Sequence, residues 1–438
     1  MKKIIIFTCL CIVATIHSNY LSESLIALSN HLEQFATSFF KTEAPKPKKL
    51  VPRKDFFKDI MGIDEKKFEQ FFDKNVDVEE QKKVHISYKE YNNHEVTLLH
   101  SADGKQTFQA GYFEELSIGK LREQVAKITK TSDGKLNAII AYNPFGKDYA
   151  RYVDVGAMQA EPDYKDAIFQ VASNFSTLEP TSKTHLPEAG ITGYISDKTQ
   201  GPFAAISAAP GLIQRMYYAF YNTEIASFLW RQTRDHQIAL LDDTNIPVTN
   251  GYVVIDPTYL GNLTKNADVK KYFSDTLAKI KVGFQGEVQV TFGEVTGDKH
   301  VLLERNDQII NQVYTAAIDF GGENYKYRDN ALIQDLAKTI LKAAYEGTIL
   351  AAIAKRKQKV VLTLIGGGVF KNPLEWIAGA IEHVTPLIKD YGLNVTVIVY
   401  NAANNSEMPE FLSALKTLID QTGGTITTHG EPKYQVLV

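Results

Sequence analysis

The stretch from residue 359 to residue 391 constrains the fold more than any other part of the chain. Its first residues, Val360–Ile365, form the apolar run VVLTLI, which is typical of a strand buried on both faces. Three glycines follow at once, Gly366, Gly367 and Gly368, where the backbone can turn sharply. From Leu374 the apolar residues then recur with helical spacing. Strand, glycine turn and helix together predict one βα unit of a parallel sheet.

The turn between that strand and that helix has the outline of an anion-binding site. Free backbone N–H groups and the positive end of a helix dipole would point the same way. We expect Asn372 to cap the helix, Pro373 to be its first residue and Glu375 to complete a capping box. The alternative is a tight turn that binds nothing. Three consecutive glycines exceed what such a turn needs, which favours a ligand-facing loop.

Apolar runs of the same kind recur along the chain, which indicates an α/β fold. Further candidate strands are Phe169–Ala172, Val313–Ile318 and Val395–Tyr400, and Leu332–Lys355 has the clearest helical pattern, with Asp329 or Asn330 able to cap it. Strands that alternate with helices imply a mostly parallel, mixed sheet covered on both faces. We therefore predict a three-layer α/β/α domain in which the three runs and Val360–Ile365 are neighbouring strands.

The pattern of composition divides the chain into four parts. Residues 1–19 look like a signal peptide, because Lys2 and Lys3 precede an apolar run that is too short to span a bilayer. Residues 20–54 predict a helix and an extended Pro/Lys linker, and residues 55–165 an N-terminal α+β extension with antiparallel strands. Residues 166–438 would form the α/β domain, with Asn250-Gly251 as a turn between two of its strands. An uncleaved anchor is the alternative for the first part, because no clean small-x-small cleavage site follows the apolar run.

The overall composition excludes several classes of function. The net charge is −3, with 44% hydrophobic and 23% charged residues, and no basic stripe suggests nucleic acid. Both cysteines, Cys9 and Cys11, lie in the signal segment, so the mature chain would hold no disulfide and no cysteine-based zinc site. We expect a secreted or exported protein with no cofactor and no stable membrane association after signal removal.

Polar residues gather at the ends of two predicted strands and in one turn. Asn174 and Phe175 follow the strand that ends at Ala172, and Asp319 follows the strand that ends at Ile318. The carboxyl ends of strands are where α/β folds place ligand contacts. A turn with Asp197, Gln200, Gly201 and Pro202 precedes a run of small residues, and a polar turn before a helix is its plainer interpretation. Ser207 lies in no Gly-x-Ser-x-Gly elbow, which excludes a serine hydrolase of that type.

The segment from Gly366 to Ala378, GGGVFKNPLEWIA, resembles the macrodomain loop of the microbial poly(ADP-ribose) glycohydrolase type. In that family a glycine-rich turn, an aromatic residue and an Asn-Pro pair open a helix over the diphosphate of ADP-ribose. The segment from Ala172 to Phe175 is similar to the strand end that presents an asparagine to the distal ribose. Gln170–Glu179 and Thr199–Pro202 are also similar to a divergent, uncharacterised macrodomain-like group. The resemblance covers about residues 169–400 and implies a macrodomain-like fold with insertions.

The resemblance also implies a set of site residues. The implied catalytic residues are Asn174, Asp197 and Gln200. Asn174 would orient the distal ribose, and Asp197 would serve as general acid/base or position a water, with Asp319 and Glu375 as reserves. The implied ligand-binding residues are Phe175, Gly201, Pro202, Asp319, Gly366, Gly367, Gly368, Val369, Phe370 and Asn372.

One departure from the family leaves the function open. The glycohydrolase signature, three glycines leading to adjacent glutamates, is absent from the loop around Asp197, so the usual acid for glycosidic cleavage is missing. Three functions therefore remain. The chain is a hydrolase that removes ADP-ribose from a protein or nucleotide-linked acceptor, a non-catalytic ADP-ribose-binding module, or a secreted interaction protein such as an effector. ADP-ribose or an ADP-ribosylated protein is the expected partner.

The signal segment yields a test of its own. We predict that the mature chain begins after roughly residue 18 and contains no cysteine, because the apolar run has signal-peptide length and flanks. Intact-mass measurement of the exported protein decides this, and a mass that retains residues 1–18 would contradict it.

Overall fold

The computed structural model describes residues 48–74, 86–221 and 226–431. The predicted signal peptide, the helix after it and the first part of the linker lie outside these ranges, so export stays a prediction. One compact unit begins at Lys49 and includes the rest of the chain.

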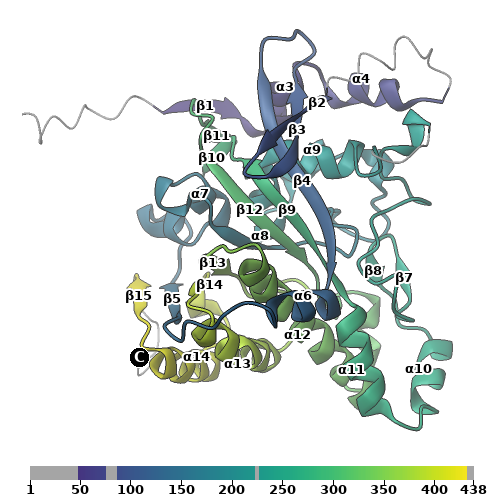
Figure 1. The fold of residues 1–438 in the computed structure, drawn as a ribbon, viewed down its shortest axis with the longest axis vertical. Helices are drawn as coiled ribbons and strands as arrows, with labels where there is room; N and C mark the ends of the chain where they lie inside the picture. The colour runs from purple at the N-terminus through teal and green to yellow at the C-terminus, as the bar shows by residue number, and fades with distance from the viewer. Residues whose placement is uncertain (1–47, 75–85, 222–225, 432–438) are drawn as a thin grey trace, which may run out of the picture. The chain divides into compact units, whose positions relative to one another are not determined.

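A sheet of ten strands forms the centre of this unit (Figure 1). Its strands are β2 (Ile86–Tyr91), β3 (His94–His100), β4 (Thr107–Ser117), β5 (Lys135–Ala141), β6 (Ile168–Ala172), β9 (Lys281–Gln289), β12 (Ile309–Thr315), β13 (Lys359–Leu362), β14 (Asn394–Val399) and β15 (Ile426–His429). The order across the sheet is β15-β5-β14-β13-β6-β12-β9-β4-β3-β2. Neighbours from β15 to β12 are parallel, and neighbours from β12 to β2 are antiparallel.

The predicted arrangement of the four apolar strands is confirmed. They are β14, β13, β6 and β12, adjacent in that order and parallel. β13 is shorter than the apolar run because side chains replace its neighbours beyond Leu362. Thr363 N donates to Gln170 Oε1 at 3.1 Å and Ile365 N to the Tyr345 hydroxyl at 3.2 Å. The backbone therefore leaves the sheet without losing its hydrogen bonds.

Helices cover both faces of the sheet, so the three-layer α/β/α class is confirmed. One face carries α6 (Ile118–Val125), α11 (Val269–Lys279), α12 (Ala331–Ala354), α13 (Leu374–Asp390) and α14 (Met408–Thr422). The other carries α7 (Val155–Gln159), α8 (Gln200–Ser207) and α9 (Ala209–Tyr217), as Figure 1 shows. Successive side chains of β13 point to opposite faces of the sheet. Val360 and Leu362 pack with α12 and α13, while Val361 packs with α7 and α8.

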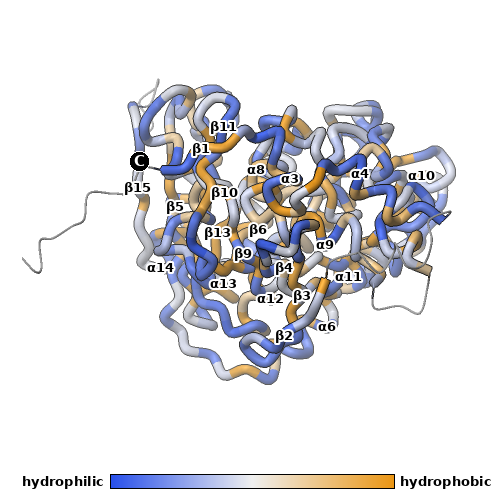
Figure 2. The backbone as a smooth tube through the Cα atoms, turned by 90° about the horizontal axis from the view of Figure 1, so that it is seen from above, coloured by the Kyte–Doolittle hydropathy of each residue, from blue (hydrophilic) through white to orange (hydrophobic). Residues whose placement is uncertain are grey.

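The longest helix, α12, is buried along most of its length. Its side-chain cap is Asn330, which accepts hydrogen bonds from the amides of Leu332 and Ile333, so the predicted cap is confirmed. Gly347 allows a close approach to the sheet, because a Cβ there would lie 2.4 Å from Val282 Cγ1. Figure 2 shows apolar backbone stretches along the central strands, where this helix packs.

Smaller elements are added around the central sheet. They are β1 (Lys49–Pro52), β10 (Phe292–Thr296), β11 (Lys299–Leu302), the hairpin β7 (Val248–Thr249) and β8 (Tyr252–Val253), α3 (Phe56–Met61), α4 (Glu65–Glu69) and α10 (Pro257–Thr264). Short 3-10 helices span Arg53–Asp55, Gln70–Phe72, Asp148–Tyr152, Pro162–Tyr164, Pro187–Ala189, Thr192–Ser196, Ser227–Leu229, Glu323–Tyr327 and Ala402–Asn404. The β7–β8 turn is confirmed, since Asn250 and Gly251 have φ of 47° and 74°.

The predicted division at residue 165 does not separate two sheets. Strands β2, β3, β4 and β5 come from the 55–165 segment, yet they pair within the same sheet as the strands of residues 166–438. The antiparallel strands join through the pairing of β4 with β9, and β5 lies between β15 and β14.

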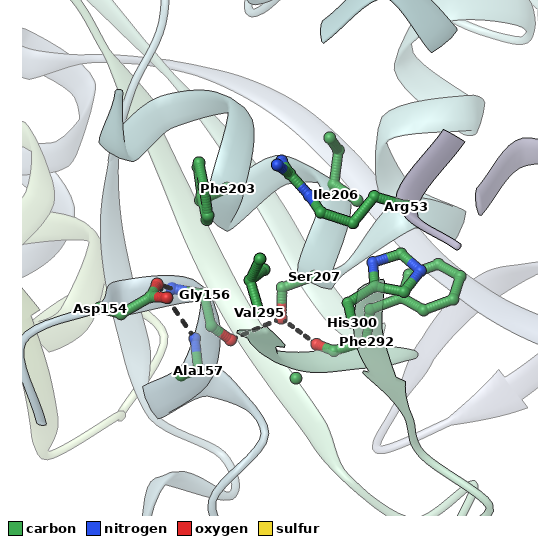
Figure 3. A pocket seen from close by; sticks show the side chains of 11 residues that line it. Arg53, Asp154, Gly156, Ala157, Phe203, Ile206, Ser207, Phe292, Val295 and His300 are labelled. Carbon is green, nitrogen blue, oxygen red and sulfur yellow. Dashed lines mark hydrogen bonds between the residues drawn. The ribbon is translucent and has the colours of Figure 1, made fainter. Parts of the chain in front are cut away.

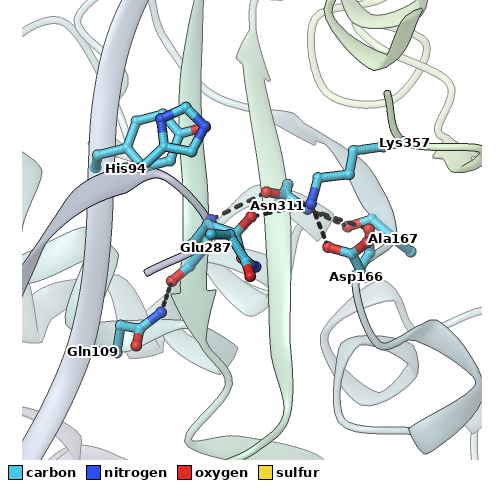
Figure 4. Close-up of polar contacts among 9 residues, drawn as sticks. His94, Gln109, Asp166, Ala167, Glu287, Asn311 and Lys357 are labelled. Atoms are coloured by element: carbon cyan, nitrogen blue, oxygen red, sulfur yellow. Dashed lines mark hydrogen bonds and ion pairs between the residues drawn. The ribbon is translucent and has the colours of Figure 1, made fainter. Parts of the chain in front are cut away.

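An ionic network around the buried Glu287 fixes the amino ends of the parallel strands (Figure 4). Lys357 contacts Asp166 and, at 3.0 Å, Glu287 Oε1. Burial opposes the charge of Lys357, but the hydrogen bonds and the charges of both carboxylates outweigh it and raise its pKa. Asn311 accepts from Glu287 N at 3.1 Å, and Gln109 donates to Glu287 O at 2.7 Å. The network thereby joins β9 to the starts of β6, β12 and β13.

Beside this network β4 pairs with β9, and the two backbones come very close together at Gly111. Gly111 has φ of +83°, and a Cβ there would lie 2.0 Å from Gly286 O. Gly104 has a similar φ of +69°, but nothing lies within 4 Å of its Cβ position.

These two glycines allow strain and collision to be measured separately. Gly104→Ala should lower the free energy of unfolding by about 1 kcal/mol, the cost of a left-handed conformation. Gly111→Ala should cost about 2 kcal/mol more, because its methyl group has to displace a backbone oxygen. Urea denaturation of both variants measures the difference. Equal losses of unfolding free energy in the two variants would show that the β4–β9 pair adjusts to the added methyl group without cost.

Candidate functional site

Four loops meet at the carboxyl edge of the parallel strands. They follow β6, β12, β13 and β14, which are neighbours in the sheet. Parallel strands bring their carboxyl ends together, and α/β folds bind ligands at this edge. The predicted site residues lie in the first three of these loops and at the start of α8.

The glycine loop after β13 presents a row of free amides. Its turns are closed by Gly367 N to Leu364 O at 3.0 Å and by Asn372 N to Gly366 O at 3.0 Å. Within the residues that the structure describes, the amides of Gly368, Val369 and Phe370 donate to no protein acceptor. Gly368 and Val369 are exposed. Three successive free N–H groups form the kind of backbone concavity that binds anions.

Asn372 holds this loop rather than capping the helix. Its buried side-chain amide donates to Ile318 O at 2.9 Å and to Gly366 O at 3.2 Å. The predicted cap is wrong, because α13 begins at Leu374 and its first amide donates to Glu407 Oε2 at 2.7 Å. That carboxylate comes from the start of α14, and Pro373 stands at the N-cap position. The predicted capping box with Glu375 is therefore also absent from α13.

The three glycines have different surroundings. Gly366 has φ of +75°, and a Cβ there would lie 2.6 Å from Ala317 Cβ, so glycine is required. A side chain at Gly367 would point at α13, 2.8 Å from Ile377 Cδ1. Gly368 faces open space, with nothing within 4 Å of its Cβ position. Only Gly368 could therefore bear a side chain without a collision.

The loop after β12 braces the glycine loop from behind. Phe320 N donates to Phe370 O at 3.0 Å, and a Cβ on Gly321 would lie 2.3 Å from Val369 O. Asp319 turns inward, and its Oδ1 accepts the amides of Gly321 at 2.8 Å and Gly322 at 3.1 Å. Burial raises the pKa of the Asp319 carboxyl, while both amides oppose the rise. The carbonyl side of the glycine loop is thus occupied and its amide side is left free.

Asn174 and Phe175 lie inside the protein. Asn174 is 4% exposed, and its Oδ1 accepts from Ser176 N, Ser176 Oγ and Leu178 N at 2.8–3.2 Å. Its Nδ2 donates to Asn250 O at 3.1 Å. Phe175 is 4% exposed and belongs to the core beneath α12. Both residues therefore organise the loop after β6, with little surface left for a ligand.

The β7–β8 hairpin covers that loop. Phe175 N donates to Gly251 O at 2.7 Å, and a Cβ on Gly251 would lie 2.3 Å from Asn174 Nδ2. The Tyr252 hydroxyl donates to Pro180 O at 2.6 Å, and its ring lies 6.0 Å from the Phe370 ring. Tyr252 thus connects the loop after β6 with the glycine loop.

The start of α8 packs directly on the end of β6. Gln200 Oε1 accepts Ala172 N at 3.1 Å, which continues the hydrogen bonding of the strand. A Cβ on Gly201 would lie 2.3 Å from Ala172 O, and Pro202 is buried. Asp197 is half-buried and accepts Thr199 N at 2.7 Å, as in a polar turn. The structure therefore brings these four predicted residues to the end of the strand that leads to Asn174.

Glu179 joins them, although sequence reasoning did not single it out. It is 7% exposed, and its Oε2 lies 2.4 Å from the position of a Cβ on Gly201. Its Oε1 has no hydrogen-bond partner in the described part of the chain. Burial raises the pKa of Glu179 well above its usual range, against the pull of the Arg215 guanidinium and with a smaller contribution from Asp197. The sequence feature that could have identified Glu179 is its position, as an acidic residue shortly after a buried strand.

Arg215 provides a buried cation behind this carboxyl. It is fully buried on α9, and its guanidinium lies 3.7 Å above the Tyr314 ring. Nε donates to Thr177 O at 3.3 Å, and Nη1 donates to Gln285 Oε1 at 3.0 Å. Nη2 has no partner among the described residues.

An exposed aromatic pair lies farther along the same edge of the sheet. Phe145 follows β5 and Tyr400 follows β14, with exposures of 64% and 44%. Their rings are 5.6 Å apart in an edge-to-face arrangement. Val369, on the glycine loop between them and β6, is 66% exposed. Sequence reasoning did not identify this pair, and two aromatic residues just beyond predicted strands were the available signal.

Cavities elsewhere do not provide a better nucleotide site. Figure 3 shows Ser207 between Asp154 and His300, with Arg53 above them, around a cavity of about 10 Å³. That volume holds about one water molecule. His300 is buried against the Phe292 ring, and burial lowers its pKa to about 3, so it stays neutral.

A second cavity, of about 120 Å³, lies between α9 and strands β2–β4 and is lined by none of the predicted site residues. Among the described residues no group of His, Cys, Asp and Glu is arranged to hold a metal ion. No helix in the described ranges is long and apolar enough to cross a membrane.

Comparison with protein-family models and with curated proteins gives no match. Solved structures similar to this chain are microbial poly(ADP-ribose) glycohydrolases. The enzyme from Deinococcus radiodurans in complex with ADP-ribose has a TM-score of 0.38 at 11% identity, with 70% of this chain and 94% of that chain covered. The enzyme from Thermomonospora curvata bound to the inhibitor ADP-HPD has a TM-score of 0.36 at 13% identity, with 73% and 92% covered. The structural neighbours are thus the group whose loop the sequence resembles.

Proposed function

We propose that this chain binds ADP-ribose at the carboxyl edge of its parallel strands and hydrolyses the bond between ADP-ribose and a protein or nucleotide-linked acceptor. The observation that carries the proposal is the row of free amides at Gly368, Val369 and Phe370. A diphosphate is the part of ADP-ribose that needs such a row, because it carries two negative charges and only acceptor atoms.

The amides, more than the helix end, account for the affinity. The first amide of α13 is already bonded to Glu407, whose negative charge also offsets the helix dipole. The loop amides have no such competitor, and their carbonyl side is fixed by the loop after β12. Lys371, which is exposed in the same loop, adds a positive charge near the diphosphate.

Two flanking surfaces match the two ends of ADP-ribose. Phe145 and Tyr400 offer exposed ring faces for an adenine, and stacking on an aromatic ring is worth about 1–3 kcal/mol per base. In the other direction, Phe370 and Tyr252 border the way to the loop after β6. The distal ribose would then lie near the carboxyl groups of Asp197 and Glu179, where cleavage of its glycosidic bond needs a proton donor.

A non-catalytic binding module is the second candidate, and two observations favour it. The Asn174 side chain is used within its own loop, and the β7–β8 hairpin covers it. Gly201 and Pro202, at the start of α8, supply no carboxylate. Binding of ADP-ribose without turnover would select this candidate.

A charge change in the amide row tests the proposal. Gly368→Glu should weaken ADP-ribose binding by at least tenfold, about 1.4 kcal/mol, because its carboxylate would lie where the amides hold the diphosphate. The fold should be retained, since Gly368 has open space and no positive φ. Isothermal titration calorimetry with ADP-ribose gives both affinities.

Gly379→Glu is the matched control. Gly379 lies on α13 with nothing within 4 Å of its Cβ position, so it accepts the same side chain away from the loop. Its affinity should equal that of the wild type. Undetectable binding of ADP-ribose to the wild type, or equal affinities in all three proteins, would refute the proposed site.

A further inference from the structure

We infer that Glu179 is the proton donor of this site and protonates the leaving oxygen when the glycosidic bond breaks. The inference rests on the proposed function and names the residue that supplies its chemistry. It replaces the expectation that Asp197 has this role.

The position of Glu179 follows from the loops around it. It lies in the loop after β6, and its carboxyl packs against Gly201 in the first turn of α8. Pro180, the next residue, accepts the Tyr252 hydroxyl, and the Tyr252 ring reaches Phe370 of the glycine loop. A ligand whose diphosphate lies on the loop amides would therefore have its distal ribose directed toward Glu179.

Tyr252 lies close to this carboxyl, and burial, with a smaller contribution from the charge of Glu179, raises the pKa of Tyr252. Glu179 is 7% exposed, and the Tyr252 hydroxyl donates to the carbonyl of the adjacent Pro180 at 2.6 Å. With the acceptor in place, water has little access to the carboxyl, which favours proton transfer to the leaving oxygen.

Three other carboxyl groups at this edge already accept hydrogen bonds from backbone amides. Asp319 accepts two backbone amides, Asp197 accepts one, and Glu407 binds the first amide of α13. Glu179 differs, because its Oε1 has no partner within the described ranges and it is deeply buried.

Burial therefore favours the protonated form of Glu179. The removal of water raises its pKa well above the usual range, and the charge of Asp197 acts in the same direction. Arg215 opposes this effect but does not cancel it. A carboxyl group that is protonated near neutral pH is suited to act as a general acid.

The proposed step balances with water as the co-reactant. The bond between the anomeric carbon of the distal ribose and the acceptor oxygen breaks, and its electron pair stays on the oxygen. The Glu179 proton moves to that oxygen, so the acceptor leaves as an alcohol. Water then adds to the anomeric carbon and returns one proton to the Glu179 carboxylate, which yields free ADP-ribose.

Leaving-group dependence separates a proton donor from a structural residue. We would compare two ADP-ribose glycosides, one with a 4-nitrophenyl and one with an alkyl leaving group. The nitrophenolate leaves without a proton, whereas the alkoxide does not. Glu179→Gln should lower kcat for the alkyl glycoside by a hundredfold or more and for the nitrophenyl glycoside by less than fivefold. Its affinity for ADP-ribose should stay within twofold of the wild type.

Two further variants complete the comparison. Glu382→Gln, an exposed site on α13, controls for the chemical change and should behave as the wild type. Asp197→Asn should leave the ratio of the two rates unchanged. If Asp197→Asn shows the selective loss instead, or if Glu179→Gln slows both glycosides equally, Glu179 is not the donor.

The same measurements keep this inference apart from the proposed function. A wild type that does not bind ADP-ribose refutes both. A wild type that binds ADP-ribose but cleaves neither glycoside refutes the donor role and leaves a binding module. A wild type that cleaves both glycosides, with the alkyl rate intact in Glu179→Gln, refutes the donor role alone.

The protonation of Glu179 has a separate test in stability. A raised folded-state pKa stabilises the protein below the unfolded pKa, about 4.3, and this contribution is lost as pH rises through the folded value. The glutamine variant has no such group. The urea midpoint of the wild type, relative to that of Glu179→Gln, should therefore fall as pH rises above about 4.3. A relative midpoint that stays constant or rises would mean that Glu179 is ionised beside Arg215, which would overturn the inference.

Discussion

The candidate site depends on one buried side chain, the amide of Asn372. It ties the loop after β12 to the first glycine of the glycine loop, through Ile318 O and Gly366 O. This bond decides which side of the loop is free, because the carbonyls of Val369 and Phe370 face the β12 side. The amides are then left without partners in the part of the chain that the structure describes. An anion site of this kind results from holding a backbone in place, with no charged side chain required.

Hydrogen bonds to side chains explain why amides at the ends of β13 and β6 are not free. Beyond the ends of the strands, side chains take over the bonds that neighbouring strands would have made. Gln170 and Tyr345 do so after β13, and Gln200 does so at the end of β6. Buried amides need such partners. The exposed row at Gly368–Phe370 can lack them because water or a ligand replaces them.

The sheet could be predicted from the sequence, while the details of the site could not. Apolar, β-branched runs are local signals, and they predicted the four central strands as neighbours, whereas their order comes from the structure. The cap of α13 depends on Glu407, 33 residues beyond the amide that it binds, and no local pattern reveals it. The burial of Glu179 could not be predicted for the same reason, because it depends on α8 and on Arg215. Asn174 was expected from a family pattern, but a hairpin inserted later in the chain covers it.

The packing at the start of α8 explains why Glu179 and a carboxylate side chain at position 201 exclude each other. A side chain at Gly201 would have its Cβ 2.3 Å from Ala172 O and 2.4 Å from Glu179 Oε2. Such contacts are impossible, so a glutamate at this position would require Glu179 to leave and α8 to move away from β6. The same space is occupied by a carboxyl group that the loop after β6 supplies.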